Sequence, residues 1–183
     1  MGMPERYVGL DFIIDTNRIN AKEKLPNMNT LEKWARDGVI SLDIAAVAQD
    51  ETKQGTDSSR RNKAFSYVSL LLKPGSEPGR RKEIEKILDP KSRNDQRDID
   101  IVLTADHHKK ILITADGGSK NQPEGILGHK NQLAALIPPI QVISDHEAVK
   151  LVNDKIKSRD QSARWNAERT SIECPDWVGR DDK

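Results

Sequence analysis

Short apolar runs alternate with amphipathic stretches along most of the chain, and this alternation predicts the secondary structure. The run at residues 10–14 is apolar except for Asp11 and rich in branched side chains, as expected for a strand buried on both faces. Between such runs, apolar residues recur every three or four positions, which indicates helices. The predicted strands are residues 10–14, 39–42, 111–114 and 140–143, and the predicted helices are residues 29–37, 44–54, 58–72, 80–88, 94–109, 132–137 and 145–158.

Polar residues at the helix starts identify the expected N-caps. Asn29 with Glu32 three residues later forms a capping-box pattern at the start of the first helix. Asp43 is the expected cap of the second helix, and Asn94 or Asp95 is that of the long helix before the third strand. These caps predict where the helices begin.

Strands that alternate with helices and have continuous apolar runs predict an α/β fold, with a parallel sheet covered on both faces by helices. Residues 1–158 are expected to form one domain. Residues 159–183 are more polar and are expected to form a C-terminal tail, either docked on the domain or partly disordered.

Composition restricts the function classes. The 183 residues include 30 Lys and Arg against 29 Asp and Glu, a net charge of +1, so any contact with nucleic acid must be local. Aromatic residues, at 4%, are too few for rows of base-stacking platforms. The single cysteine, Cys174, allows no internal disulfide and no thiolate zinc cage. With no apolar segment of signal-peptide or membrane-spanning length, we expect a soluble cytoplasmic protein without membrane contact.

Acidic residues follow two of the predicted strands. Asp15 ends the first strand and Asp116 follows the third, and ligands of open parallel sheets bind at the carboxyl ends of the strands. Glu51 and Asp98 lie on helices that can reach the same edge. Four carboxylates in one pocket repel one another unless a cation neutralises them. An oxygen-only donor set suits Mg²⁺ or Mn²⁺.

Four motifs around these acids resemble, in order, those of PIN-domain nucleases of the bacterial toxin-like branch. They are residues 14–17 (IDTN), Glu51 followed by Gly55, residues 97–105 (RDIDIVLTA) and residues 113–116 (ITAD). The acids within them are 36, 47 and 18 residues apart, as is ordinary in that branch. The match covers residues 7 to 155.

The resemblance implies a Rossmann-like sheet of strand order 3-2-1-4-5 and a metal-dependent ribonuclease. The metal-binding and catalytic residues that it implies are Asp15, Glu51, Asp98 and Asp116. It also implies supporting roles for Asn17 and Thr114. Asp95 is either an outer acid of the site or a helix cap. Many members are toxins that bind a cognate antitoxin, and many form homodimers, so both partners are expected.

The expected activity is divalent-metal-dependent hydrolysis of phosphodiester bonds in single-stranded or structured RNA, either as a toxin or in RNA processing. This chemistry needs an activated water and neutralised phosphoryl oxygens, but no protein nucleophile. The alternative is a non-catalytic binding or regulatory module with the same acidic pocket. A phosphoacceptor receiver domain fits less well, because it needs paired acids where this chain has only Asp15.

Basic residues supply candidate RNA contacts. Residues 53–97 contain 12 basic and six acidic side chains, so this stretch is locally positive. The candidate RNA-binding residues are Arg18, Arg60, Arg61, Lys63, Arg80 and Arg81. A solvated helix surface is the alternative interpretation of these runs.

Each acid also has a purely structural interpretation, as a helix cap or a turn residue. His107 and His108 have one as well: they lie in the last turn of a predicted helix, where a cation-capable side chain complements the helix dipole. The coincidence of four acids with four ordered motifs favours the metal site over these separate explanations.

Overall fold

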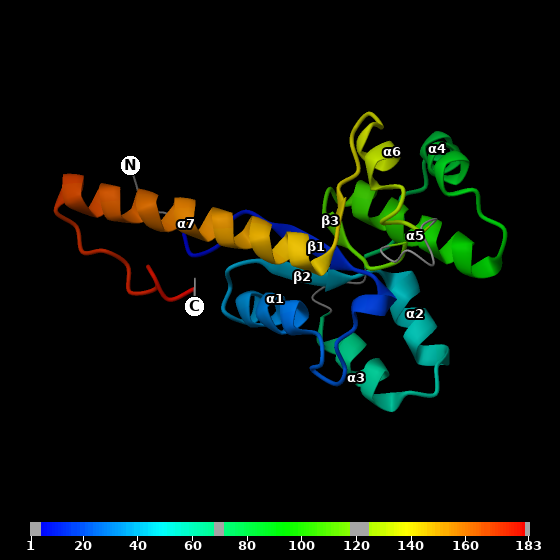
Figure 1. Ribbon diagram of the computed structural model, residues 1–183, viewed down its shortest axis with the longest axis horizontal. Coiled ribbons are helices and arrows are strands. Elements are labelled where there is room, and N and C mark those ends of the chain that lie inside the picture. The colour runs from blue at the N-terminus through cyan, green and yellow to red at the C-terminus, as the bar shows by residue number, and fades with distance from the viewer. Residues whose placement is uncertain (1–4, 68–71, 118–124, 182–183) are drawn as a thin grey trace.

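A four-stranded, all-parallel sheet forms the centre of the molecule, with strand order β2-β1-β3-β4 (Figure 1). The computed structural model describes residues 5–67, 72–117 and 125–181. The strands are β1 (Asp11–Ile14), β2 (Ser41–Ile44), β3 (Ile111–Ile113) and β4 (Val142–Ile143). The predicted α/β class and parallel sheet are therefore confirmed.

Strand β1 is central because it pairs with a parallel strand on each side, and its last three side chains are apolar. Phe12 pairs with Leu42 of β2 on one side and with Ile111 of β3 on the other. Phe12, Ile13 and Ile14 are completely buried. This explains the continuous apolar run, since a strand covered on both faces has no solvent side for polar residues.

The strand count differs from the five strands that the family resemblance implies. The described residues contain four strands, and beyond β2 the sheet continues only as a single parallel bridge between Ala45 and Leu72. The helix predicted over 58–72 was too long, because it ends at Ser66 and Leu72 is extended. Residues 68–71 lie outside the described part.

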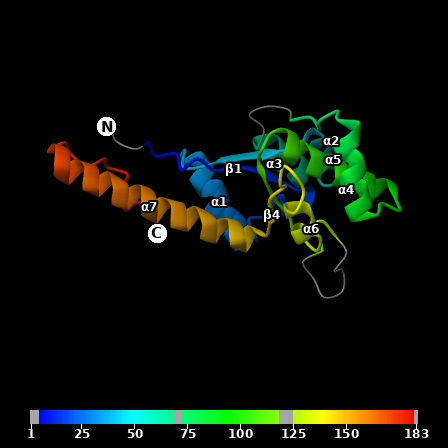
Figure 2. The ribbon, with the colours of Figure 1, turned by 90° about the horizontal axis from the view of Figure 1, so that it is seen from above.

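Seven helices surround the sheet in the described residues (Figures 1 and 2). Helix α1 packs against α7 and β2, while α5 contacts β3 and the neighbouring helices α2 and α4. Their bounds are α1 (Pro26–Arg36), α2 (Ala46–Gln54), α3 (Ser58–Ser66), α4 (Pro78–Leu88), α5 (Arg93–His107), α6 (Lys130–Ala134) and α7 (Asp145–Thr170).

The first two predicted caps were wrong. Helix α1 begins at Pro26, whose fixed φ suits the first helical position, so Asn29 lies inside the helix and its side chain binds Asn20. Asp43 is part of β2 and forms an ion pair with Lys110 instead of capping α2. In both cases the residue that resembles a cap lies inside a helix or strand and not directly before a helix.

The cap of α5 is Ser92, not Asn94 or Asp95. The Ser92 hydroxyl accepts from the Asp95 N–H, and the Asp95 carboxylate accepts from the Ser92 N–H at 2.8 Å, which completes a capping box. Asp95 is thus the third helical residue.

Helix α7 runs past residue 158 to Thr170, and the following segment returns along it (Figure 1). Asp181 is completely buried there: its carboxylate pairs with Arg6 at 2.7 Å and with Arg159 at 3.0 Å. Its carbonyl accepts from the Trp34 indole N–H at 2.8 Å. The Arg159 guanidinium also stacks over the Trp177 ring at 4.4 Å. The C-terminal segment is therefore docked through residues 177–181.

None of the helices in the described ranges has the length and apolar character needed to cross a membrane.

Candidate metal centre

Asp15 ends β1 with a buried carboxylate. It is 2% exposed, and its backbone N–H continues the ladder by donating to the Ile113 carbonyl at 3.0 Å. The carboxylate accepts from the hydroxyls of Thr16 at 3.0 Å and Thr114 at 2.7 Å, and from the Asn17 amide. Burial raises the pKa of Asp15, and the hydrogen bonds from Thr114 and Thr16 oppose the rise.

Thr114 joins the ends of β1 and β3. Its buried hydroxyl donates to Asp15 and accepts from the backbone N–H of Asp116 at 3.0 Å. Asn17 completes the connection, because its amide carbonyl accepts from the Ala115 N–H at 3.1 Å. The two residues predicted to be supporting groups are therefore placed between the two strand-end acids.

Asp116 is held by the backbone of the segment that begins at residue 125. Its carboxylate accepts from the Ile126 N–H at 3.0 Å, and its carbonyl accepts from the Leu127 N–H at 2.7 Å. Gly125 packs directly on the carboxylate, so an added Cβ there would overlap it. Gly117 has a φ of +78°, and a Cβ on it would lie 2.7 Å from the Gly125 nitrogen. Two glycines therefore allow the close approach that orients Asp116.

Asp98 reaches the same edge from α5. The completely buried Ile99 and Val102 anchor the inner face of the helix. Desolvation, together with the negative charges of four other acids, raises the pKa of Asp98 to about 7; in order of effect these acids are Asp15, Asp116, Asp95 and Glu51. All four predicted metal-binding acids are therefore close enough to interact electrostatically.

Glu51 faces a cavity of about 480 Å³ beside the strand ends. The walls of this cavity, called here the entry cavity, include Asn17, Glu51 and Arg60, together with Thr16, Thr52, Gly55, Thr56 and Asp57. The Arg60 guanidinium donates to the Thr16 carbonyl and so fixes the 3₁₀ turn Thr16–Arg18 that follows Asp15. A basic side chain thus lies next to the acidic edge.

The donor set suits a hard divalent cation, since it consists of carboxylate and other oxygens and is strained by mutual repulsion. Within the part of the chain that the structure describes, no three His, Cys, Asp or Glu side chains already have an arrangement that could hold a metal ion. The Asp15 oxygens, for example, are turned toward Thr16, Asn17 and Thr114. Binding would therefore require these side chains to exchange hydrogen bonds for the cation.

Asp95 belongs to the helix cap. Hydrogen bonds from the Ser92 side chain and the Lys91 backbone lower the pKa of Asp95, so it is a fixed negative charge near Asp98. His107 and His108 lie at the other end of α5, remote along the helix from Asp98.

The candidate RNA-binding residues fall into two groups. Arg18, Arg60 and Arg61 lie near the acidic edge: Arg18 pairs with Asp145 at 3.3 Å, and Arg61 donates to the Gly55 carbonyl at 3.4 Å. The buried Arg61 Nε has no hydrogen-bond partner among the described atoms. Lys63, Arg80 and Arg81 form the second group, and each pairs with an acid elsewhere.

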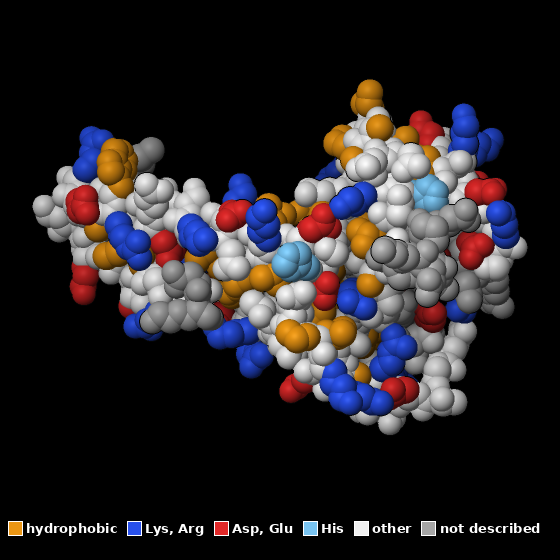
Figure 3. Space-filling view, viewed as in Figure 1, with side chains coloured by type: hydrophobic (Ala, Val, Ile, Leu, Met, Phe, Trp, Pro, Cys, Tyr) orange, Lys and Arg blue, Asp and Glu red, His pale blue; other side chains and the backbone are white. Residues whose placement is uncertain are grey.

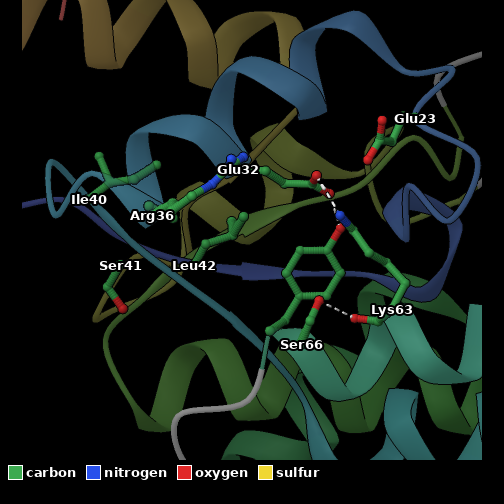
Figure 4. Close-up of a pocket in the computed structure, with 10 residues that line it drawn as sticks. Glu23, Glu32, Arg36, Ile40, Ser41, Leu42, Lys63 and Ser66 are labelled. Atoms are coloured by element: carbon green, nitrogen blue, oxygen red, sulfur yellow. Dashed lines mark hydrogen bonds and ion pairs between the residues drawn. The ribbon is translucent and has the colours of Figure 1, made fainter.

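Lys63 lines a separate cavity of about 660 Å³ between α1, β2 and α3 (Figure 4). Its ammonium pairs at 2.7 Å with Glu32, whose other oxygen accepts from the buried Tyr67 hydroxyl. Lys63 therefore connects α3 to α1.

Arg80 corrects a prediction. It is only 8% exposed and forms two hydrogen bonds with Asp106, at 2.8 and 3.1 Å, so its guanidinium faces the protein interior and is not available to RNA. Its neighbour Arg81 pairs with Asp100 on α5.

The positioning roles of two residues could not be predicted from the sequence. In the sequence, Arg60 is only one of several positive charges. Its hydrogen bond to Thr16 could not be predicted, because 44 residues of sequence separate the two. The sequence pattern does not single out Gly125. A glycine nine residues after a strand-end acid is a weak signal, because only the folded loop shows which atoms approach it.

No protein-family model matches this chain, and no curated protein matches it. The resemblance to PIN-domain nucleases therefore rests on the four motifs and stays a prediction.

Proposed function

We propose that the protein is a divalent-metal-dependent ribonuclease that hydrolyses phosphodiester bonds of RNA at the carboxyl edge of its sheet. The observation that supports this most strongly is the set of acids gathered around Asp98 at one edge, whose charges add to desolvation in raising the pKa of Asp98. Such a cluster is stable in its charged form only with a counter-cation. Mg²⁺ and Mn²⁺ are the cations that the oxygen donors favour.

Each acid has a distinct role in the proposal. Asp15 and Asp116 are the principal ligands, because Thr114 and two backbone N–H groups hold them at adjacent strand ends. Glu51 and Asp98 approach from α2 and α5 and ligate directly or through water. When bound, the cation neutralises phosphoryl charge and provides a water that ionises near neutral pH.

Asp98 must also lose its proton before its carboxylate can bind a cation. With its pKa at about 7, it is largely protonated in mildly acidic solution and is freed as the pH rises. Cation affinity should therefore increase with pH, since the ligand must be deprotonated.

A non-catalytic acidic module is the second candidate. It is favoured by the finding that, over the described ranges, no three potential ligands yet converge on one point. Such a module would bind Mg²⁺ or Mn²⁺ without cleaving RNA.

Incubation of the full chain with labelled single-stranded and structured RNA in Mg²⁺, Mn²⁺ or EDTA distinguishes the two. A ribonuclease yields fragments with metal and none with EDTA. Binding of metal without fragments in any condition would support the module and refute the enzyme.

A toxin role, a cognate antitoxin and a homodimer remain parts of the proposal that need their own tests. A toxin should arrest growth when expressed, and co-expression of a neighbouring small protein should relieve the arrest. Light scattering of the purified chain gives its oligomeric state directly.

A further inference from the structure

A second cavity adjoins the entry cavity. It measures about 250 Å³ and is formed mainly by the loop before α1, including Ile19, Lys22 and Lys24, together with Asn20, Ala21 and Leu25. Both cavities include Arg60 and Asp57 in their walls. They therefore meet at the start of α3 and extend the hollow from Asn17 and Glu51 to the loop at residues 19–25.

The charges along this path favour a polyanion. Lys22 and Lys24 are exposed at its outer end, and Arg60 stands in the middle. Glu51 at the inner end adds a negative charge, and Glu23 between the two lysines in sequence lines the separate cavity at Lys63. Asp57 adds another, but its carboxylate accepts from the backbone N–H groups of Ser59 and Arg60 as the cap of α3. These two donors and the positive helix end partly neutralise it.

The cavity walls also indicate how the strand is recognised. Among the described residues that line the two cavities there is no aromatic side chain, so the path has no base-stacking platform there. Contacts from two lysines and an arginine are suited to phosphates, which are the same in every sequence.

Other basic residues are less suitable for this role. Figure 3 shows basic and acidic side chains interspersed over the face that it presents. Lys63, Arg80 and Arg81 are ion-paired with Glu32, Asp106 and Asp100 respectively. RNA would have to break those pairs, whereas the lysines at residues 22 and 24 project from an exposed loop.

We propose that single-stranded RNA runs from the acidic edge past Arg60 to Lys22 and Lys24, which bind its backbone phosphates without reading its bases. This inference rests on the proposed ribonuclease function and specifies its substrate: an unpaired strand held by its backbone over the nucleotides next to the cleaved bond.

The test measures binding separately from cleavage. Affinity for a labelled, unstructured RNA is measured in Mg²⁺ at several salt concentrations, in an Asp116→Asn background that prevents turnover. Each lost phosphate contact should make the slope of log affinity against log salt shallower by about 0.7, or about five-fold weaker binding at 0.1 M salt. Lys22→Ala combined with Lys24→Ala should remove two contacts, and Arg60→Ala one.

Arg169→Ala is the matched control, because Arg169 is exposed at the far end of α7 and stacks only on Trp165 among the described aromatic rings. It should leave the slope unchanged. Arg60→Ala could also disturb the turn that it holds, so the double lysine variant, which alters only exposed loop side chains, is the stricter test. Circular dichroism verifies that each variant is folded.

The outcomes separate the two proposals. Unchanged affinity and slope in the lysine variant, with RNA cleavage by the wild-type chain intact, would overturn the path and leave the ribonuclease standing. A wild-type chain that cleaves no RNA with either metal would refute the ribonuclease itself. An affinity that differs between unstructured RNAs of different base sequence would contradict recognition of the backbone alone.

Discussion

The Thr114 hydroxyl donates a hydrogen bond of 2.7 Å to the Asp15 carboxylate, and both groups are buried at the ends of adjacent parallel strands. Ninety-nine residues separate them in sequence. The same hydroxyl accepts from the Asp116 N–H, so one side chain sets the spacing of two acids. A hydroxyl suits this position because it can donate and accept at once.

Thr114→Val should weaken both the fold and the metal site. It leaves the Asp116 N–H and one Asp15 oxygen without this partner, at a cost of about 1–3 kcal/mol in the free energy of unfolding. The pKa of Asp15 should rise further, since the Thr114 hydrogen bond lowers it, and Mn²⁺ affinity should fall. Urea unfolding and Mn²⁺ titration measure the two effects. Thr114→Ser, which keeps the hydroxyl, should preserve Mn²⁺ affinity; equal affinities in the wild type and the Val variant would contradict the role.

Asp98 predicts a specific pH dependence of stability without metal. The folded protein retains the Asp98 proton up to a pKa of about 7, whereas the unfolded chain loses it near 3.8. Between these values the unfolded state binds fewer protons, so this group makes the free energy of unfolding decrease as the pH rises. In EDTA, the wild type should lose more stability between pH 5 and pH 8 than Asp98→Asn does. Identical losses in urea unfolding would show that the pKa of Asp98 is not raised in the folded protein.

Gly125→Ala should displace the Asp116 carboxylate, because the added Cβ would overlap it and also lie 2.5 Å from the Gly117 nitrogen. Overpacking of this kind typically costs about 1–3 kcal/mol. Mn²⁺ affinity should fall with it. Gly79→Ala is the control: its Cβ meets nothing within 4 Å, and alanine favours the helix by about 0.5–1 kcal/mol. Thermal melts and Mn²⁺ titrations of both variants decide the matter, and a Gly125→Ala protein with wild-type affinity would disprove the close approach.

The buried pair of Arg80 and Asp106 should affect the free energy of unfolding and not the affinity for RNA. Burial raises the pKa of Asp106, but hydrogen bonds from Arg80 outweigh this and hold it below its ordinary value, so the pair's contribution is lost as the pH falls below about 4. Arg80→Met leaves the buried Asp106 carboxylate with only the exposed Lys109 ammonium, at 3.5 Å, and should cost up to about 3–5 kcal/mol.

Combining Arg80→Met with Asp106→Leu should recover much of that loss, because no unpaired charge then remains. Urea unfolding measures both variants, and RNA affinity is compared with that of the wild type under conditions where each is folded. Weaker RNA binding by the double variant would restore Arg80 as an RNA contact.

Local patterns predicted the elements of the sheet well, because apolar runs record burial directly. The four strands lie within two residues of their predicted starts, and the two strand-end acids follow from them. Helix ends were less predictable. Ser92 and Asp95 both had the chemistry of a cap, and only the backbone path shows which one precedes the first turn.

Long-range partners account for the remaining errors. Arg159 and Asp160 are buried on α7 and bind Asp181 and Gly179 of the returning segment, so the helix continues where its apolar periodicity fades. Arg80 resembles a surface residue until Asp106 is placed beside it. At the site, the strand-end acids could be found from sequence, whereas Gly125 and the hydrogen bond from Arg60 could not, since each depends on a contact made by the tertiary fold.

Single-turnover cleavage of an unstructured RNA in Mn²⁺ tests the central claim most directly, using the wild type, Asp116→Asn and Asp100→Asn. Asp100 is a matched control: it lies on α5 two residues from Asp98 but pairs with Arg81. The wild type and Asp100→Asn should cleave at similar rates and stop in EDTA, while Asp116→Asn should be slower by more than about 100-fold, beyond the loss typical of an indirect metal-site contact. Cleavage by Asp116→Asn at the wild-type rate, or cleavage that persists in EDTA, would contradict a carboxylate-held metal as the basis of activity.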